Sequence, residues 1–216
     1  MAPTVRHLTP LDHHLTRWKN GRGTTRQIAT WPLGATLDDG DLCWRVALAG
    51  VAERGPFSQF PGYERLLVIT RGAGLLLEHD GDAPRAALAA RVPYRFNGDW
   101  STIAEPVGGP VEDLNVLFDG ERVQASVEVL QLGARRWRGE VCPAGTSANS
   151  DEAAHVLLHV CDGNLRARFT GEEEAFELHA GETLLASELV GAEELDLAGR
   201  ADDTLALLIT LLPAAR

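Results

Sequence analysis

The chain has 216 residues, of which 44% are hydrophobic, and a formal net charge of −11. This length suffices for one large all-β domain or for two small packed lobes. No apolar run approaches the ~20 residues of a membrane helix and no long basic run offers a surface to a phosphate backbone, so we expect neither a membrane nor a nucleic acid as a partner.

The N-terminal residues and the cysteines point to the cytoplasm. Residues 1–19 mix His, Arg, Asp and Pro and contain no apolar stretch followed by a small-residue cleavage site, so we expect no signal peptide. Cys43, Cys142 and Cys161 are scattered and show no CxxC spacing. A disulfide framework or a zinc knuckle is therefore not expected.

The first half of the chain consists of short apolar or alternating segments separated by turns. Residues 42–49 alternate with the period of two that is typical of a half-buried strand. Glycine-bearing turns follow at Gly72 and Gly98. We expect strands over residues 42–49, 66–70, 75–78, 91–96 and 114–118.

The second half repeats this scheme, with a loop expected over 139–151. Residues 66–72 and 156–163 share the order apolar strand, glycine turn, second strand, which indicates an internal repeat. The segment Ala180–Glu188, AGETLLASE, resembles a turn-and-strand unit that is frequent in cupin barrels. We expect two β-barrel lobes, residues 1–120 and 121–216. Strands are expected over residues 127–132, 156–161, 165–169, 176–178, 184–186 and 205–212.

Residues 18–29 are dense in hydrogen-bond donors around two glycines, which permit a close backbone approach. The segment is not a phosphate-binding Walker A loop, because the GKS or GKT ending is absent. It either contributes to a ligand site or caps a barrel. Its candidate ligand-binding residues are Lys19, Asn20, Thr25 and Arg26.

Several motifs in residues 15–118 resemble the HutD/Ves family. Residues 18–29 read WKNGRGTTRQIA, close to the family's WKNGGGTTREI, with Arg22 in place of a glycine. Residues 55–62, GPFSQFPG, followed by Arg65, match another element, as do FNGD at 96–99 and DLN at 113–115. The resemblance implies a two-lobed bicupin of double-stranded β-helix (RmlC-like jelly-roll) barrels. It further implies an accessory or regulatory role without a catalytic metal.

A cupin metal site would need two histidines and a glutamate ahead of a glycine. With Gly72 as that glycine, the glutamate position falls on Arg65 and no histidine pair precedes it. The best remaining metal candidate is His155, His159 and Cys161, which could equally be histidines satisfied within the barrel. We predict no metal and no cofactor. The guanidinium of Arg65, at the position of the cupin glutamate, suits the carboxylate of a ligand, although Arg65 could instead pair with a structural Asp or Glu.

These observations favour a protein that binds a small carboxylate, and the resemblance implies urocanate or a related histidine-catabolism intermediate. Arg65, Arg45 or Arg26 would contact the carboxylate, and an aromatic side chain would cover a planar ring. The predicted ligand-binding residues are Lys19, Asn20, Thr25, Arg26, Arg45, Phe57, Arg65, Phe96 and Asn115.

Two other classes of function stay open. A metal-independent isomerase or epimerase needs an acid and a base on opposite sides of its substrate. Lys19, Asp99 and Asp113 are the only candidates, and no histidine falls in the matched motifs, so we assign no catalytic residue. A protein-interaction module with the acidic second lobe as its surface is the third class, and a homodimer is also left open.

Overall fold

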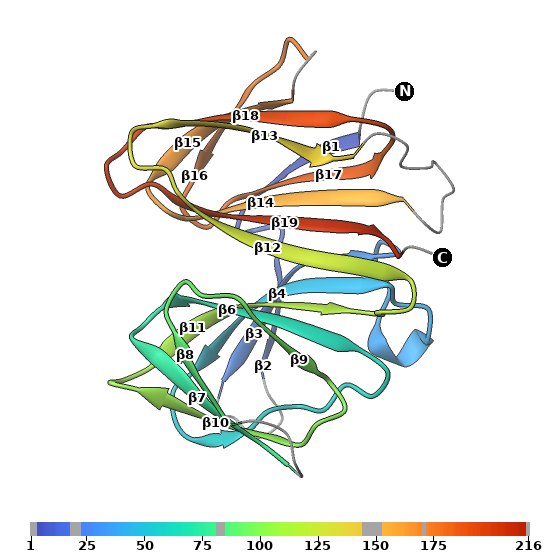
Figure 1. Ribbon diagram of the computed structural model, residues 1–216, viewed down its shortest axis with the longest axis vertical. Helices are drawn as coiled ribbons and strands as arrows, with labels where there is room; N and C mark the ends of the chain where they lie inside the picture. The colour runs from blue at the N-terminus through green and yellow to red at the C-terminus, as the bar shows by residue number, and fades with distance from the viewer. Residues whose placement is uncertain (1–3, 18–22, 81–84, 144–152, 170–171, 215–216) are drawn as a thin grey trace. The chain divides into compact units, whose positions relative to one another are not determined.

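The computed structural model describes residues 4–17, 23–80, 85–143, 153–169 and 172–214 (Figure 1). Within these ranges the chain forms strands and one short 3-10 turn at Leu37–Asp39. The strand pairings are antiparallel throughout. The predicted all-β class is confirmed.

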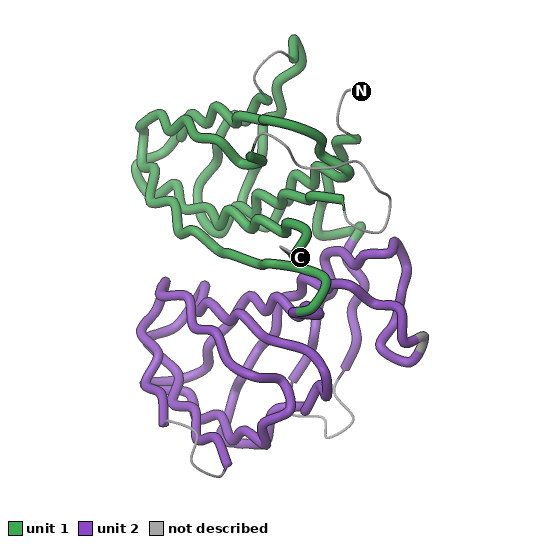
Figure 2. The backbone as a smooth tube through the Cα atoms, turned by 45° about the vertical axis from the view of Figure 1, so that its right-hand side comes forward, with its two compact units in different colours: residues 1–12, 121–216 green, residues 13–120 purple. Residues whose placement is uncertain are grey.

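Two compact units make up the chain (Figure 2). Residues 13–120 form what we call the N-terminal unit, and residues 1–12 with 121–216 form the C-terminal unit. The predicted lobe 1–120 differs at its start, because strand β1 (Thr4–Leu8) pairs with strand β17 (Thr183–Leu189) of the C-terminal unit. Leu8 is buried in this arrangement.

The N-terminal unit holds a six-stranded sheet of order β2-β3-β4-β11-β6-β9 and a four-stranded sheet of order β5-β10-β7-β8. The bounds of the first sheet are β2 His14–Arg17, β3 Thr24–Trp31, β4 Trp44–Val51, β11 Val111–Phe118, β6 Glu64–Arg71 and β9 Tyr94–Asn97. Those of the second are β5 Gly55–Pro56, β10 Thr102–Val107, β7 Gly74–His79 and β8 Ala86–Ala89.

The C-terminal unit holds a five-stranded sheet of order β1-β17-β14-β19-β12 and a four-stranded sheet of order β13-β18-β15-β16. The further strands of the first sheet are β14 Ala154–Asp162, β19 Leu205–Pro213 and β12 Val123–Gln131. Those of the second are β13 Arg136–Cys142, β18 Glu193–Gly199, β15 Asn164–Phe169 and β16 Phe176–His179.

Both units repeat one strand order. The order β4-β11-β6-β9 corresponds to β12-β19-β14-β17, and β5-β10-β7-β8 corresponds to β13-β18-β15-β16. In each unit the chain crosses from the larger to the smaller sheet at a glycine with positive φ, Gly72 at 101° and Gly163 at 71°. A Cβ at Gly72 would lie 2.7 Å from Cγ1 of Val111, so no side chain fits there. The finer expectation that each unit is a jelly-roll barrel stays a prediction.

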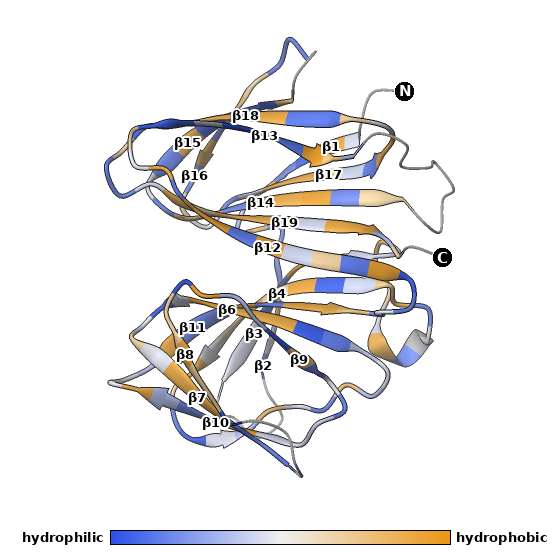
Figure 3. Ribbon diagram, in the orientation of Figure 1, coloured by the Kyte–Doolittle hydropathy of each residue, from blue (hydrophilic) through white to orange (hydrophobic). Residues whose placement is uncertain are grey.

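Each unit has its own apolar core, drawn from both of its sheets. In the N-terminal unit Leu67 and Ile69 of β6 pack with Leu75 and Leu77 of β7. In the C-terminal unit β14 and β19 are apolar along most of their length, as Figure 3 shows in orange, and both are buried for most of their residues. Such continuous apolar runs are typical of strands buried on both faces.

Several sequence-based boundaries differ from the structure, and two of them have a clear physical reason. A strand was expected over 91–96, but Arg91 has a φ of 65° in a turn, and β9 begins at Tyr94. A loop was expected over 139–151, but β13 continues to Cys142 because it pairs with β18. The charged residues of β13 lie on its exposed face and hide its strand character in the sequence.

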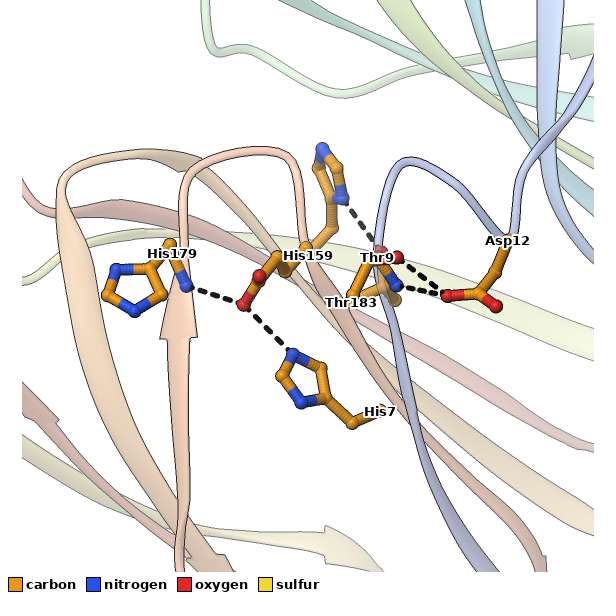
Figure 4. A network of polar contacts seen from close by, with 7 residues as sticks. His7, Thr9, Asp12, His159, His179 and Thr183 are labelled. Atoms are coloured by element: carbon orange, nitrogen blue, oxygen red, sulfur yellow. Dashed lines mark hydrogen bonds and ion pairs between the residues drawn. The ribbon is translucent and has the colours of Figure 1, made fainter.

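A polar network links β1 to the rest of the C-terminal unit (Figure 4). Oε2 of Glu182 accepts hydrogen bonds from the backbone N–H of His179 and from Nε2 of His7, each at 2.9 Å. Burial by itself would raise the pKa of Glu182, but these two hydrogen bonds lower it below its usual value. A carboxylate with a lowered pKa stabilises the fold above its unfolded-state pKa, and this stabilisation is lost as the pH falls through the folded-state pKa.

We therefore expect Glu182→Gln to lower the free energy of unfolding by about 1 kcal/mol at pH 7. The difference from wild type should shrink as the pH falls through the lowered folded-state pKa of Glu182, because the carboxylate then becomes protonated in the folded state as well as in the unfolded state. Urea denaturation at several pH values measures both effects. Glu177→Gln is the control, since Glu177 is exposed and forms only surface ion pairs with Arg166 and Arg200. An equal loss in both variants would contradict the role of Glu182.

Candidate functional site

The N-terminal unit contains a cavity of about 470 Å³. It lies over the inner face of the six-stranded sheet, with residues 56–60 on its other side. The lining residues are Thr25, Arg45, Ala47, Ala49, Pro56, Phe57, Ser58, Phe60, Arg65, Asn115 and Leu117.

Two alanines at the centre of the sheet make room for this cavity. On β4, Ala49 lies opposite Thr25 of β3, and Ala47 lies opposite Asn115 of β11. Successive side chains of a strand alternate between the two faces, so these residues face the same way. The small alanine side chains leave space on this face of the sheet, and the longer side chains around them border that space.

Two arginines border the cavity on one row of the sheet. Arg45 of β4 and Arg65 of β6 both lie opposite Leu117 of β11, one on each side. Arg65 in turn lies opposite Phe96 of β9. The sheet thus directs two guanidinium groups toward the same space.

The Arg65 side chain is held on several sides. Arg65 is only 6% exposed. Its Nη2 donates to Oδ1 of Asn115 at 2.7 Å and its Nη1 to the carbonyl oxygen of Ser58 at 3.4 Å, so two of its five N–H groups are used among the described residues. Three aromatic rings also surround the guanidinium. The rings are those of Phe57, Phe60 and Phe96, whose centroids lie 5.0, 5.3 and 4.8 Å from Cζ.

Arg65 remains a cation at neutral pH. Burial lowers its pKa to about 10; Asp113 acts to raise that pKa, and Arg45 lowers it further. Neither arginine forms an ion pair with a carboxylate among the described residues. Arg45 is half-buried, and its Cζ lies 5.2 Å from the Phe60 ring centroid. The cavity therefore has a cationic wall that can attract an anion.

Behind Asn115 lies a buried carboxyl group. Asp113 is fully buried, and its Oδ1 accepts a hydrogen bond from Nδ2 of Asn115. Burial raises the pKa of Asp113 to about 7; Arg65 acts to lower that pKa, and Glu112 adds to the increase. Two hydrogen bonds through the Asn115 amide thus connect the Asp113 carboxyl group to the Arg65 guanidinium, which lines the cavity.

The structure brings together most of the residues that the sequence suggested. Thr25, Arg45, Phe57, Arg65 and Asn115 line the cavity. Phe96 is not one of the lining residues, but its ring lies against the Arg65 guanidinium. Lys19 and Asn20 lie outside the described residues.

Arg26 does not belong to this group and is removed from the candidate site. It lies opposite Leu48, on the other face of the sheet from Thr25, and its Nη2 is 3.6 Å from Oε2 of Glu112. Its interaction is an ion pair on the outer face that reaches across β4, from β3 to β11.

Sequence reasoning did not select Ala47, Ala49 or Phe60 for the site. Ala47 and Ala49 could have been found from the alternation of residues 42–49, because they share the parity of Arg45. Phe60 lies in the matched GPFSQFPG element, but the sequence does not show which of its aromatic residues faces the cavity. Asp113 was considered only as an acid or base, and its burial requires the structure.

Among the described residues, the histidines of β14 are not grouped with enough neighbouring ligands to hold a metal ion. Nδ1 of His159 hydrogen-bonds Oγ1 of Thr183 at 2.9 Å (Figure 4), and burial lowers the pKa of His155 to about 4. Among the residues that the structure describes, no three His, Cys, Asp or Glu side chains come together as metal ligands would. That part of the chain also contains no helix with the length and apolarity of a membrane span.

Comparisons with known sequences agree with the matched motifs. The HutD family model matches residues 11–206. An "uncharacterized 21.2 kDa protein in hutC 3'region" of Pseudomonas putida is 28% identical over 181 residues, covering 81% of this chain and 86% of the relative. Protein Ves of Citrobacter koseri is 34% identical over 113 residues, covering 52% of this chain and 56% of the relative.

Solved structures extend the similarity over nearly the whole chain. A conserved protein of unknown function from Pseudomonas aeruginosa PAO1 has a TM-score of 0.80 and 28% identity, covering 98% of this chain and 100% of its own. HutD from Pseudomonas fluorescens SBW25 (formate condition) has a TM-score of 0.74 and 25% identity, with the same coverage. The fold is of the cupin type that the sequence predicted. Together, the motif matches, the family model and these structures show that the chain belongs to the HutD family.

Proposed function

We propose that this protein binds a small carboxylate metabolite in the cavity of the N-terminal unit and acts as an accessory or regulatory protein. The buried Arg65 guanidinium carries the proposal. It lines the cavity, is oriented by Asn115 and Ser58, and has no ion-pair partner among the described residues. A fixed guanidinium fork matches a carboxylate in both charge and shape.

The size and lining of the cavity favour a planar acid over a very small one. A volume of about 470 Å³ lies within the usual range of small-molecule sites. A ligand gains at most about 1.5 kcal/mol per non-hydrogen atom, so formate reaches about 4.5 kcal/mol, which corresponds to millimolar binding. An imidazole-acrylate such as urocanate has enough atoms for micromolar binding. Its ring can lie against Phe57 or Phe60, and Arg45 can donate to its far end.

The family and the name of a relative support a biological role for this ligand. The Pseudomonas putida relative is named for the hutC region. We therefore propose urocanate or a related intermediate of histidine breakdown as the ligand. We also place the protein in the cytoplasm, supported by three buried free thiols, Cys43, Cys142 and Cys161.

A metal-independent isomerase is the second candidate, because Asp113 has a raised pKa near the cavity. However, its Oδ1 accepts from Asn115, and Asp113 is not among the lining residues. The two ring nitrogens of His79, another possible acid or base, hydrogen-bond the hydroxyl groups of Thr102 and Tyr94. No described lining residue supplies an acid or base opposite Asp113, so the geometry favours binding over catalysis.

We expect wild type to bind urocanate with micromolar affinity in a calorimetric titration at low salt. Arg65→Lys keeps the charge but loses the planar fork, and we expect a loss of about tenfold or more in affinity. Arg45→Ala should also weaken binding about tenfold, because it removes a second cation from the cavity wall.

The matched control for these arginine variants is Arg26→Ala, because Arg26 lies on the opposite face of the same sheet. It should leave the affinity unchanged. Circular dichroism confirms that each variant is folded. Equal losses in all three variants would mean that the ligand does not sit in this cavity, and no binding by wild type at millimolar ligand would refute urocanate.

A second prediction tests the position of the ligand independently of charge. Ala47→Leu would fill the cavity from its floor, because Ala47 is a buried lining residue at the centre of the sheet. We expect ligand binding to disappear while the free energy of unfolding changes by about 1 kcal/mol or less. Ala87→Leu is the control, because Ala87 is an exposed residue of β8, and this variant should bind the ligand normally. Retention of wild-type affinity in Ala47→Leu would place the ligand elsewhere.

A further inference from the structure

We propose that Asp113 is a positioning residue whose carboxyl group takes up a proton when an anion binds at Arg65. The affinity for the anion would then fall as the pH rises through the neutral range. This inference rests on the proposed function, because it needs a ligand carboxylate at Arg65.

The geometry isolates one carboxyl group beside one cation. Asp113 is fully buried, and its Oδ2 has no hydrogen-bond partner among the described residues. Its Oδ1 accepts from Nδ2 of Asn115, while Oδ1 of that same amide accepts from Nη2 of Arg65 at 2.7 Å. The amide therefore links the carboxyl group to the guanidinium without a direct ion pair. An ionised carboxyl group with an unpaired buried oxygen is costly, so it depends on the field of the nearby cation.

Arg65 is the cation that matters most to Asp113. Burial raises the pKa of Asp113 to about 7, and the charge of Arg65 is what acts to lower it. On β11 itself, Glu112 acts to raise the pKa further, although Arg26 and Arg71 lie 3.6 and 4.0 Å from its oxygens on the outer face.

The other neighbouring elements carry little further charge toward Asp113. Opposite Asp113, β4 presents Ala49 and β6 presents Ile69. On β3, Thr25 occupies the same row and is uncharged. Arg45 of β4 faces the cavity. On β7, the pKa of His79 is lowered, mainly by burial and also by the charge of Arg65. The balance at Asp113 thus lies between its burial, to which Glu112 adds, and the charge of a single guanidinium.

Ligand binding would change this balance. A carboxylate at Arg65 brings a negative charge to the guanidinium and cancels much of the field that keeps Asp113 ionised. Asp113 then accepts a proton from solvent, and the complex carries one proton more than its separate components. By linkage, protonation of Asp113 strengthens anion binding by the same factor. Affinity is therefore highest below the pKa of free Asp113 and falls as the pH rises above it.

The test is a calorimetric titration of wild type with trans-cinnamate, which shares the acrylate of urocanate but has no group that titrates near neutral pH. Two cationic buffers of different ionisation enthalpy report the number of protons taken up. We expect uptake of up to roughly half a proton per ligand at pH 7, because free Asp113 is then already about half protonated, and a roughly fivefold to tenfold weaker affinity at pH 8 than at pH 6. Asp113→Asn should abolish both effects. Asp38→Asn, an exposed residue of the same unit, should preserve both.

The outcomes separate this inference from the proposed function. Binding without proton uptake, or with uptake that persists in Asp113→Asn, overturns the inference and leaves the proposed function standing. No binding of cinnamate or urocanate at any pH overturns both. If Asp113→Asn does not fold, 13C-carboxyl NMR of aspartate-labelled wild type replaces it. A buried carboxyl group whose titration midpoint rises when cinnamate is added supports the inference, and an unchanged midpoint overturns it.

Discussion

The N-terminal unit is organised around one buried guanidinium. Burying a charge without compensation costs several kcal/mol, so Arg65 needs hydrogen bonds and polarisable neighbours. Residues 57–60 supply two aromatic rings and a carbonyl oxygen, and β11 supplies the Asn115 amide. These two segments are far apart in sequence but meet at Arg65. The constraint explains why the matched motifs GPFSQFPG, Arg65 and DLN occur together in one chain.

The C-terminal unit has the same strand order but a different interior. On the corresponding strands β14 and β19, the residues that face its core are apolar, among them Val156, Leu158 and Leu208. Leu165 and Leu197 from the smaller sheet complete this packing. One copy of the repeat is thus filled by aliphatic side chains, whereas the other has, beside its smaller apolar core, alanines and arginines that line a cavity. The repeat provides the scaffold, and a few substitutions on one face determine what the scaffold can bind.

The sequence predicted the elements whose signals are local. Residues 42–49 show strand alternation, and the glycine at position 72 indicates the turn in which the structure has a positive φ. It did not predict the properties that depend on pairing. The sequence predicts Arg26 in the site because it lies in the donor-dense segment 18–29, and only the pairing of β3 with β4 shows that Thr25 rather than Arg26 shares the face of Ala49. Arg65 was identified from a motif alignment, but its contact with Asn115 depends on the pairing of β6 with β11.

The amide between Asp113 and Arg65 determines what the site can do. A direct ion pair between the two would neutralise the guanidinium and leave little attraction for an anionic ligand. Asn115 instead satisfies one hydrogen-bonding position on each partner and keeps them apart, so that the cavity wall retains its positive charge. The carboxyl group remains close enough to respond to that charge, although it is fully buried. In the function that we propose, a side chain without formal charge thus keeps the anion site open and couples it to a buried proton-binding group.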